Sequence, residues 1–178
     1  MSHDDTALLY SLVRTIPDFP SPGIRFRDIM PLLADPRGLA RALDALAHGI
    51  APGSVDVVAA IEARGFLLGG ALAQRLGCAL VAVRKPGKLP GPATGIDYAL
   101  EYGTDRLEMH VDAFSPGARV LVTDDLIATG GTASACGELI ERAGGHITGF
   151  RFLIDLPELG GSQRLRLRGW PSTAVMQF

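Results

Sequence analysis

The sequence predicts one α/β domain over residues 1–178, with a mostly parallel central sheet flanked by helices. Helical and strand patterns alternate along the chain, and this order favours parallel strands that are joined through helices. The β-prone runs are short and apolar, which is typical of buried strands. Residues of the AVILMFWYC set make up 47% of the chain, enough for a hydrophobic core, and no linker or internal repeat divides it.

The N-terminal region is predicted to hold two helices with an extended segment between them. The i, i+3, i+4, i+7 spacing of an amphipathic helix is followed by Leu9, Leu12, Val13 and Ile16. Three prolines within residues 17–22 end that helix and force an extended, turning path. Asp35 and Pro36 suit the N-cap and first position of the second helix. We expect about residues 6–34 to pack over the domain as a hood segment.

The middle of the chain begins with a strand, a helix and a second strand. Residues 55–61 and 78–83 are apolar and β-prone, and residues 66–76 between them have a helical pattern that ends at Gly77.

Turn-forming residues dominate the next segment. Several prolines and glycines fall within residues 84–97, where we expect a long mobile loop. Residues 98–102 and 107–111 alternate weakly between apolar and polar side chains, which suggests a hairpin around residues 103–105.

The C-terminal part returns to alternating elements. Residues 120–123 and 147–154 are predicted strands, and about residues 132–143 form the helix between them. Arginines at positions 164, 166 and 168 alternate with two leucines, and a strand with one solvated face explains this better than a nucleic-acid patch.

Composition excludes several classes of protein. The net charge is −2, so no basic excess indicates a nucleic-acid partner. No apolar run approaches the ~18 residues that a membrane-spanning helix needs, and the polar, acidic start is unlike a secretory signal. The two cysteines lie far apart and the four histidines lack metal-ligand spacing, so we expect a cytoplasmic protein without a disulfide or a zinc site.

The strongest chemical pattern lies at residues 120–132. A buried strand leads into Asp124 and Asp125, and a loop of small residues then opens a helix. Glycines let the backbone approach an anion, and the helix N-terminus supplies N–H groups and a positive dipole end, so the loop is a predicted phosphate cradle. Neither Gly-x-x-x-x-Gly-Lys-Ser/Thr nor Gly-x-Gly-x-x-Gly occurs here. Paired carboxylates suit a sugar diol or hydrated Mg²⁺, so the pattern indicates a phosphorylated ribose.

Residues 120–132 resemble the phosphoribosyl-pyrophosphate motif of the type I phosphoribosyltransferases. Further segments narrow the resemblance to the adenine phosphoribosyltransferases, and it runs from about Ile16 to the last strand. These segments are Phe-Pro-Ser-Pro-Gly-Ile (19–24), Phe-Arg-Asp-Ile (26–29), Arg-Gly-Phe (64–66), Arg-Lys (84–85), Lys-Leu-Pro-Gly (88–91) and Leu-Glu-Tyr-Gly (100–103).

The resemblance implies a role for each matching position. The 5-phosphate of the ribose would be held by Ala128, Thr129, Gly130, Gly131 and Thr132, and the ribose hydroxyls by Asp124 and Asp125. Pyrophosphate would be bound by Ala63, Arg64, Gly65, Arg84, Lys85 and Lys88. The adenine ring would lie between Phe26 and Leu126 and be read by backbone groups of Arg25 and Arg27.

The resemblance also implies the reaction and its partners. Glu101 would take the proton from adenine as N9 attacks C1 of the ribose, giving AMP and pyrophosphate in purine salvage. Mg²⁺ would arrive with the substrate. The resemblance assigns it no direct side-chain ligand, and water molecules could bridge it to Asp124 or Asp125. Because Arg84 and Lys85 act across a subunit interface in the family, the resemblance implies a homodimer.

Simpler interpretations exist for the same residues. The two aspartates could be a charge pair near a helix, Glu101 a solvated hairpin residue, and Arg64 a surface arginine at a helix start. The basic residues at 84, 85 and 88 could belong to a solvated loop, although no acidic residue follows them before Asp97.

Rival functions also remain open at this point. They are the same reaction on another purine and a sugar-phosphate-sensing regulator, although no DNA-binding module is left over. Two positions depart from the family pattern. Arg25 replaces a usual apolar residue, and Thr123 replaces a usual valine, so its hydroxyl needs a partner.

Overall fold

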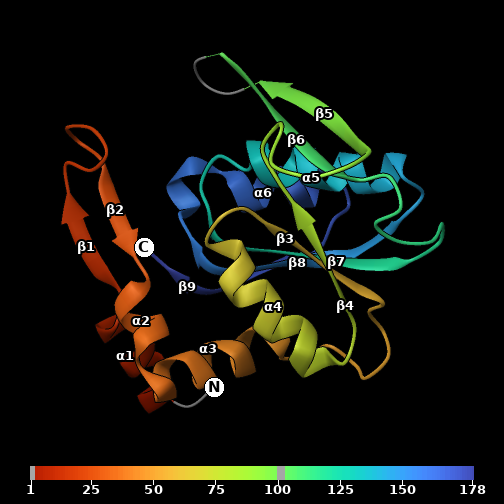
Figure 1. Cartoon of the computed structure of the whole chain (residues 1–178). Coiled ribbons are helices and arrows are strands. Elements are labelled where there is room, and N and C mark those ends of the chain that lie inside the picture. Colours follow the sequence, from red (N-terminus) through yellow and green to blue (C-terminus); the bar gives the residue numbers. More distant parts are fainter. Residues whose placement is uncertain (1–2, 100–102) are drawn as a thin grey trace.

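A five-stranded parallel sheet forms the centre of the computed structural model, which describes residues 3–99 and 103–178. The strand order is β4–β3–β7–β8–β9, and every neighbouring pair is parallel. The strands are β3 (Val57–Ile61), β4 (Ala79–Val83), β7 (Arg119–Ile127), β8 (His146–Asp155) and β9 (Ser172–Gln177). The predicted fold class is confirmed, because parallel strands alternate with helices that cover both faces of the sheet (Figure 1).

Helices on the two faces enclose two hydrophobic cores. α5 (Gly131–Arg142) and α6 (Gly161–Leu167) lie on one face, and α3 (Pro36–Ala47) and α4 (Gly65–Leu76) lie on the other (Figure 1). α1 (His3–Ser11) packs on α3. Successive strand residues point to opposite faces, so Val120 and Val122 enter the α5 core while Leu121 enters the other.

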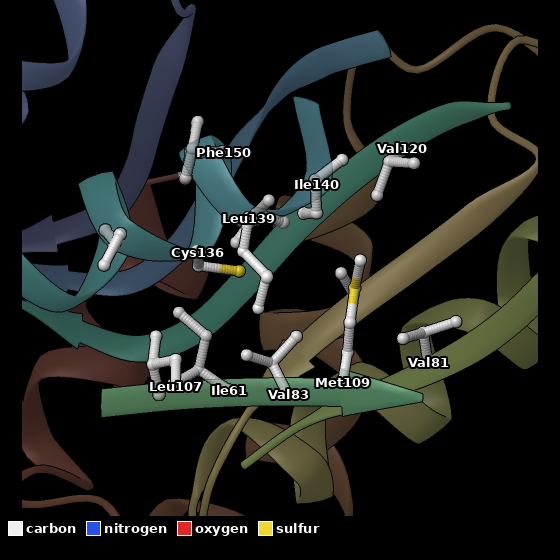
Figure 2. Close-up of a cluster of buried hydrophobic side chains, with 14 of the residues drawn as sticks. Ile61, Val81, Val83, Leu107, Met109, Val120, Cys136, Leu139, Ile140 and Phe150 are labelled. Atoms are coloured by element: carbon white, nitrogen blue, oxygen red, sulfur yellow. The ribbon is translucent and has the colours of Figure 1, made fainter. Parts of the chain in front are cut away.

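Cys136 lies at the centre of the core beneath α5. Figure 2 shows its sulfur among aliphatic side chains from the sheet, from α5 and from the hairpin of β5 (Ala93–Ala99) and β6 (Thr104–His110). The side chain is fully buried, and this burial raises the pKa of its thiol. The two cysteines of the chain, Cys78 and Cys136, are both free thiols.

The N-terminal helix is shorter than predicted. α1 ends at Ser11, and Ile16 belongs to β1 (Arg14–Pro17), which pairs antiparallel with β2 (Arg25–Asp28). Arg14 at the start of β1 donates a hydrogen bond from Nε to Asp28 Oδ2 at 3.1 Å. This cross-strand pair and the β1–β2 ladder hold residues 14–17 extended. The prediction that the helix continues to Ile16 is therefore wrong. α2 (Met30–Ala34) follows and leads into α3.

The hairpin is confirmed with different bounds, and the preceding loop is shorter than predicted. β5 (Ala93–Ala99) pairs antiparallel with β6 (Thr104–His110), so residues 93–97 are strand rather than loop. The cause is burial: Ile96 faces Leu107 across the ladder, and both side chains lie in the core. Proline and glycine at 86–92 account for the part that stays irregular.

The alternating arginines near the C-terminus lie on a helix, not on a strand. α6 spans Gly161–Leu167 and follows a short 3₁₀ helix, η1 (Pro157–Leu159). Leu165 is fully buried, but Leu167 is 82% exposed. A strand would place both leucines on one face, whereas a helix turns the second away from the core.

Among the described residues 3–99 and 103–178, no helix has the length and apolar character needed to cross a bilayer.

Candidate functional site

A cleft of about 420 Å³ opens at the carboxyl ends of β3 and β7. Ligands of open α/β sheets bind at this edge. The cleft is lined by Glu62, Ala63, Arg64, Lys85, Asp124, Asp125, Leu126, Ile127, Ala128, Thr129, Gly130, Gly131, Thr132, Ala133 and Phe152. The structure therefore brings the predicted phosphate loop, the two aspartates, Ala63, Arg64 and Lys85 to one cavity.

The loop between β7 and α5 is shaped by glycine. Gly130 has φ +75° and precedes the first residue of α5, and a Cβ there would lie 2.9 Å from the Gly161 Cα. The Gly161 N–H donates to the Ala128 carbonyl oxygen at 3.0 Å, which joins the start of α6 to the loop. The N-terminal N–H groups of α5 have no intrahelical partners, and this end of the helix borders the cleft. The loop thus has the geometry of an anion site.

The two aspartates lie within β7 rather than after it, because the strand continues to Ile127. Asp125 is only 4% exposed and accepts a hydrogen bond from the Arg64 guanidinium. Asp124 Oδ1 accepts from the Asp125 N–H at 2.8 Å. Burial, and then the neighbouring charge of Asp125, hold the pKa of Asp124 well above its usual value. A cation or hydroxyl donors in the cleft would therefore stabilise the charged form of Asp124.

Arg64 connects the aspartates to the N-terminal hood. It directly precedes α4, and its guanidinium contacts Asp125 on one side while Cζ lies 4.8 Å from the centre of the Phe26 ring on the other. Gly65 lets α4 begin against β7, because a Cβ there would lie 2.7 Å from Asp124 Oδ1.

The basic residues at 84 and 85 already contact carboxylates. Arg84 Nε donates to Glu62 Oε2 at 2.9 Å, and Lys85 Nζ donates to Asp105. The hydrogen bond from Lys85 lowers the pKa of Asp105. In the sequence, the first acidic residue after these basic residues is Asp97. In the fold, Glu62 and Asp105 lie close enough to accept their hydrogen bonds. Lys88 is exposed, and its carbonyl oxygen accepts from Arg84 Nη1 at 2.9 Å.

Tyr98 joins the β5–β6 hairpin to the phosphate loop. Its hydroxyl lies 2.9 Å from Lys85 Nζ, 3.2 Å from Asp105 Oδ2 and 3.2 Å from Thr132 Oγ1. Sequence analysis missed Glu62, Tyr98 and Asp105, because no local motif marks them as neighbours of the cleft.

A second, larger cavity of about 910 Å³ lies beside the cleft. It shares four lining residues with the cleft: Arg64, Leu126, Ala128 and Thr129. Its other lining residues are Gly23, Ile24, Arg25, Phe26, Arg27, Leu156, Glu158, Leu159 and Phe178. The predicted base-binding residues thus lie together, next to the phosphate loop. Sequence analysis missed the contribution of Leu156, Glu158, Leu159 and Phe178.

Aromatic and cationic side chains line this second cavity. The Phe26 ring meets Phe19 edge-on with centres 5.1 Å apart, and the Arg27 guanidinium lies 4.4 Å from the centre of the Phe178 ring. Arg25, the departure from the family pattern, is exposed, so its charge stays in solvent. The other departure, Thr123, is fully buried, and its hydroxyl donates to the Arg151 carbonyl oxygen at 2.9 Å. The expected partner for this hydroxyl is therefore present.

Glu101, the predicted proton acceptor, lies outside the described residues, as do Leu100 and Tyr102 of the same motif.

The fold and the cleft match a known class of protein. The model of the family described as "Phosphoribosyl transferase domain" matches residues 26–164, which is more than half of the chain. The chain therefore belongs to the phosphoribosyltransferase family.

Similar sequences and solved structures narrow the class. An adenine phosphoribosyltransferase of Methylobacterium radiotolerans is 57% identical over 166 residues, covering 93% of this chain and 92% of its own. One from Novosphingobium aromaticivorans is 54% identical over 178 residues, covering 100% of this chain and 98% of its own. The crystal structure of adenine phosphoribosyltransferase from Rhodothermus marinus superposes with a TM-score of 0.94 at 48% identity, covering 99% and 100% of the two chains. Within the family, the chain groups with the adenine phosphoribosyltransferases, which confirms the resemblance.

Proposed function

We propose that the protein transfers the 5-phosphoribosyl group of phosphoribosyl pyrophosphate to adenine and releases AMP and pyrophosphate, a purine-salvage reaction. The observation that carries this proposal is the pair of adjoining cavities, one against the α5 N-terminus and one against the hood, which meet at Arg64 and Leu126. A similar structure supports it. The adenine phosphoribosyltransferase of Saccharomyces cerevisiae was solved with adenine and an imino-altritol bisphosphate; it is 35% identical, with a TM-score of 0.90 and coverage of 98% and 99%.

The phosphoribosyl group would occupy the smaller cleft. The loop residues Ala128, Thr129, Gly130, Gly131 and Thr132 would bind the 5-phosphate through N–H and hydroxyl groups. Asp124 and Asp125 would accept hydrogen bonds from the ribose hydroxyls. Burial and the charge of Asp125 raise the pKa of Asp124, and hydrogen bonds from the ribose would stabilise its charged form.

Pyrophosphate would bind where β3 and β4 end. The turn at Ala63, Arg64 and Gly65 would supply N–H groups and one guanidinium, and Arg84, Lys85 and Lys88 would supply further positive charge. Arg64 and Lys85 would exchange their contacts with Asp125 and Asp105 for the incoming anion. Groups placed where the leaving charge develops contribute ~2.7–4 kcal/mol each in comparable sites.

Adenine would occupy the larger cavity, between Phe26 and Leu126. Backbone groups of Arg25 and Arg27 would read its amino group and ring nitrogen. Stacking tolerates any purine, so discrimination would come from these polar groups. A base with the wrong hydrogen-bonding edge leaves them unpaired, which costs several powers of ten in specificity.

Magnesium fits the chemistry of the cleft as a companion of the substrate. Asp124 and Asp125 offer the carboxylate oxygens that Mg²⁺ prefers, directly or through water. Within residues 3–99 and 103–178, no group of three or more His, Cys, Asp or Glu could hold a metal, so substrate oxygens would supply most of its ligands. When bound, Mg²⁺ neutralises the charge of the leaving pyrophosphate.

Glu101 would accept the proton that adenine loses as N9 attacks C1. A positioned general base contributes ~10²–10⁴-fold to the rate. Glu101→Gln should therefore lower kcat while the affinity for phosphoribosyl pyrophosphate, measured by calorimetry, stays the same. Unchanged turnover would remove Glu101 from the mechanism.

The base itself provides the most direct test of the proposed function. Pyrophosphate release should be measured from phosphoribosyl pyrophosphate and Mg²⁺ with adenine, guanine, hypoxanthine and xanthine. We expect release with adenine alone. Comparable turnover with guanine would favour the same reaction on another purine, and no release with any base would favour a sugar-phosphate-binding regulator.

We also propose a cytoplasmic homodimer of one-domain subunits, with about residues 6–34 forming the hood. Leu67 on α4 and Leu80 on β4 are 52% and 48% exposed, and these elements lie next to the Arg84–Lys85 segment. Apolar side chains exposed beside an edge strand suit a subunit interface. Light scattering at micromolar concentration should give twice the monomer mass, and an active monomer would exclude the dimer.

A further inference from the structure

The start of α6 is built into the wall of the phosphate loop. Gly161, its first residue, approaches Gly130 so closely that a Cβ on either glycine would collide with the backbone of the other segment. The hydrogen bond from the Gly161 N–H to the Ala128 oxygen fixes this contact. α5 and α6 also lie on the same face of the sheet (Figure 1). Residues in the first turn of α6 are therefore held beside the N-terminus of α5.

Arg164 is a cation that this arrangement brings close to the loop. Its N–H donates to the Gly160 oxygen at 3.0 Å, which sets its place in the first turn. Its Nη1 atom lies 3.9 Å from the position that a Cβ on Gly131 would take, and Thr129 Oγ1 lies 3.9 Å from the same position. A guanidinium and a hydroxyl donor thus flank the same residue at the N-terminus of α5.

The charges around the cleft give Arg164 a distinct position. Arg64 is paired with Asp125, Lys85 with Asp105, and Arg84 with Glu62. Within the described parts of the chain, 3–99 and 103–178, no carboxylate forms a salt bridge with Arg164, whose side chain is exposed. Arg164 therefore lies beside the loop as a cation that no described acid neutralises, although it is not among the residues that line the cleft.

We propose that Arg164 is a further binding residue for the 5-phosphate, an inference that rests on the proposed function of the loop. A guanidinium can donate two parallel hydrogen bonds to phosphate oxygens, and such charge-assisted bonds are among the strongest in proteins. To reach the phosphate, the Arg164 side chain would move from its present position beside Gly131 into the cleft. It would add charge to a loop that otherwise offers N–H and hydroxyl groups.

Calorimetry with ribose 5-phosphate and, separately, with pyrophosphate tests this role in the full-length protein. Arg164→Gln should weaken ribose 5-phosphate binding about tenfold, because a hydrogen bond to a charged group is lost. It should change pyrophosphate binding less than twofold. Arg164→Lys should restore part of the affinity, because it returns the charge without the fork geometry.

Arg166→Gln is the matched control. Arg166 is exposed on the same helix, and two residues along a helix turn a side chain to the other side. It removes the same charge from α6 but should leave ribose 5-phosphate binding within twofold of the wild type. Equal losses in both variants, or no loss in Arg164→Gln, would overturn the proposal.

The outcome for the wild type separates this inference from the proposed function. If the wild type does not bind ribose 5-phosphate at all, the function assigned to the loop fails. If the wild type binds ribose 5-phosphate and the Arg164 variants bind it equally well, the loop keeps its proposed function and Arg164 has no role in binding. Melting temperatures of all variants should stay within about 2 °C of the wild type, so that affinity changes report on binding.

Discussion

The phosphate loop and the base cavity differ in how the chain builds them. The loop, the end of β7 with its two aspartates and the start of α5 form one run of nine consecutive residues, 124–132, and Gly161 supports the loop from outside. The base cavity, which is the larger of the two adjoining cavities, draws on the β2 segment, the end of β7, residues 156, 158 and 159, and Phe178, which lie far apart in the sequence. The proposed binding by the loop depends on backbone geometry, so its residue types are restricted. The proposed binding by the cavity depends on shape, which many residue combinations can supply. The two regions should therefore respond differently to substitution.

Asp124→Asn tests the polar end of the loop and should have the largest effect. Removing this carboxylate should lower turnover at least ~10²-fold, or about 2.7 kcal/mol, because the ribose hydroxyls lose a charged acceptor. The ligand-free protein should melt at a higher temperature, because burial and Asp125 disfavour the Asp124 charge. Steady-state kinetics and thermal melting on the same preparation measure both.

The wild type and this variant should differ in how their stability depends on pH, because only the wild type has the Asp124 carboxyl group with its raised pKa. A carboxyl group with a raised folded-state pKa stabilises the protein below its unfolded pKa, and that stability is lost as pH rises through the folded value. The stability of the wild type should therefore fall relative to Asp124→Asn as pH rises from about 4. Asp97→Asn, on an exposed side chain of β5, is the control and should change neither property. Normal turnover with a lower melting temperature would make the aspartates a structural pair.

Gly161→Ala tests whether the backbone contact holds the loop in place. The added methyl would lie 2.7 Å from Ile127 Cγ1 and 2.8 Å from the Gly130 nitrogen, so the loop must move. We expect unfolding to become easier by ~1–3 kcal/mol, as for other overpacked sites, with loss of ribose 5-phosphate affinity.

Gly70→Ala is the matched control for that substitution. A Cβ at Gly70, within α4, meets only Leu80 Cδ2 at 3.9 Å. Alanine favours the helix by ~1 kcal/mol over glycine, so this variant should be more stable. If Gly161→Ala is as stable and as tight-binding as the wild type, the contact between α6 and the loop has no role.

These differences explain how much the sequence predicted. The strand–loop–helix pattern around residues 124–132 could be predicted from the sequence, because hydrogen bonding and glycine conformation act over a few residues. The extended state of residues 14–17 was not, because it depends on a ladder with β2 and on Asp28. The helix at Gly161–Leu167 was missed because so short an alternation of arginine and leucine fits a strand as well as a helix. The exposure of Leu167 beside the buried Leu165 identifies the helix, and the sequence alone does not reveal that difference in burial. Glu62 and Asp105 near the basic loop were missed because they contact Arg84 and Lys85 from other parts of the chain.

Phe178→Ala tests the base cavity and should have the smallest effect. The ring lines the cavity and contacts the Arg27 guanidinium, an interaction of ~0.5–1 kcal/mol at exposed sites. We expect the KM for adenine to rise about threefold to fivefold, with the KM for phosphoribosyl pyrophosphate unchanged. Leu167→Ala, on the 82% exposed leucine of α6, should change neither. A matching rise in both KM values would mean that the two cavities act as one unit.

The buried thiol at Cys136 has a practical consequence for labelling. Reaction with maleimides requires a thiolate at the surface, and burial both shields Cys136 and raises its pKa. Burial also raises the pKa of Cys78, which hydrogen-bonds weakly to the Ala73 oxygen. A new cysteine at the exposed Lys88 should therefore react faster than either native thiol. A fluorophore could then be attached at position 88 without first making a cysteine-free protein.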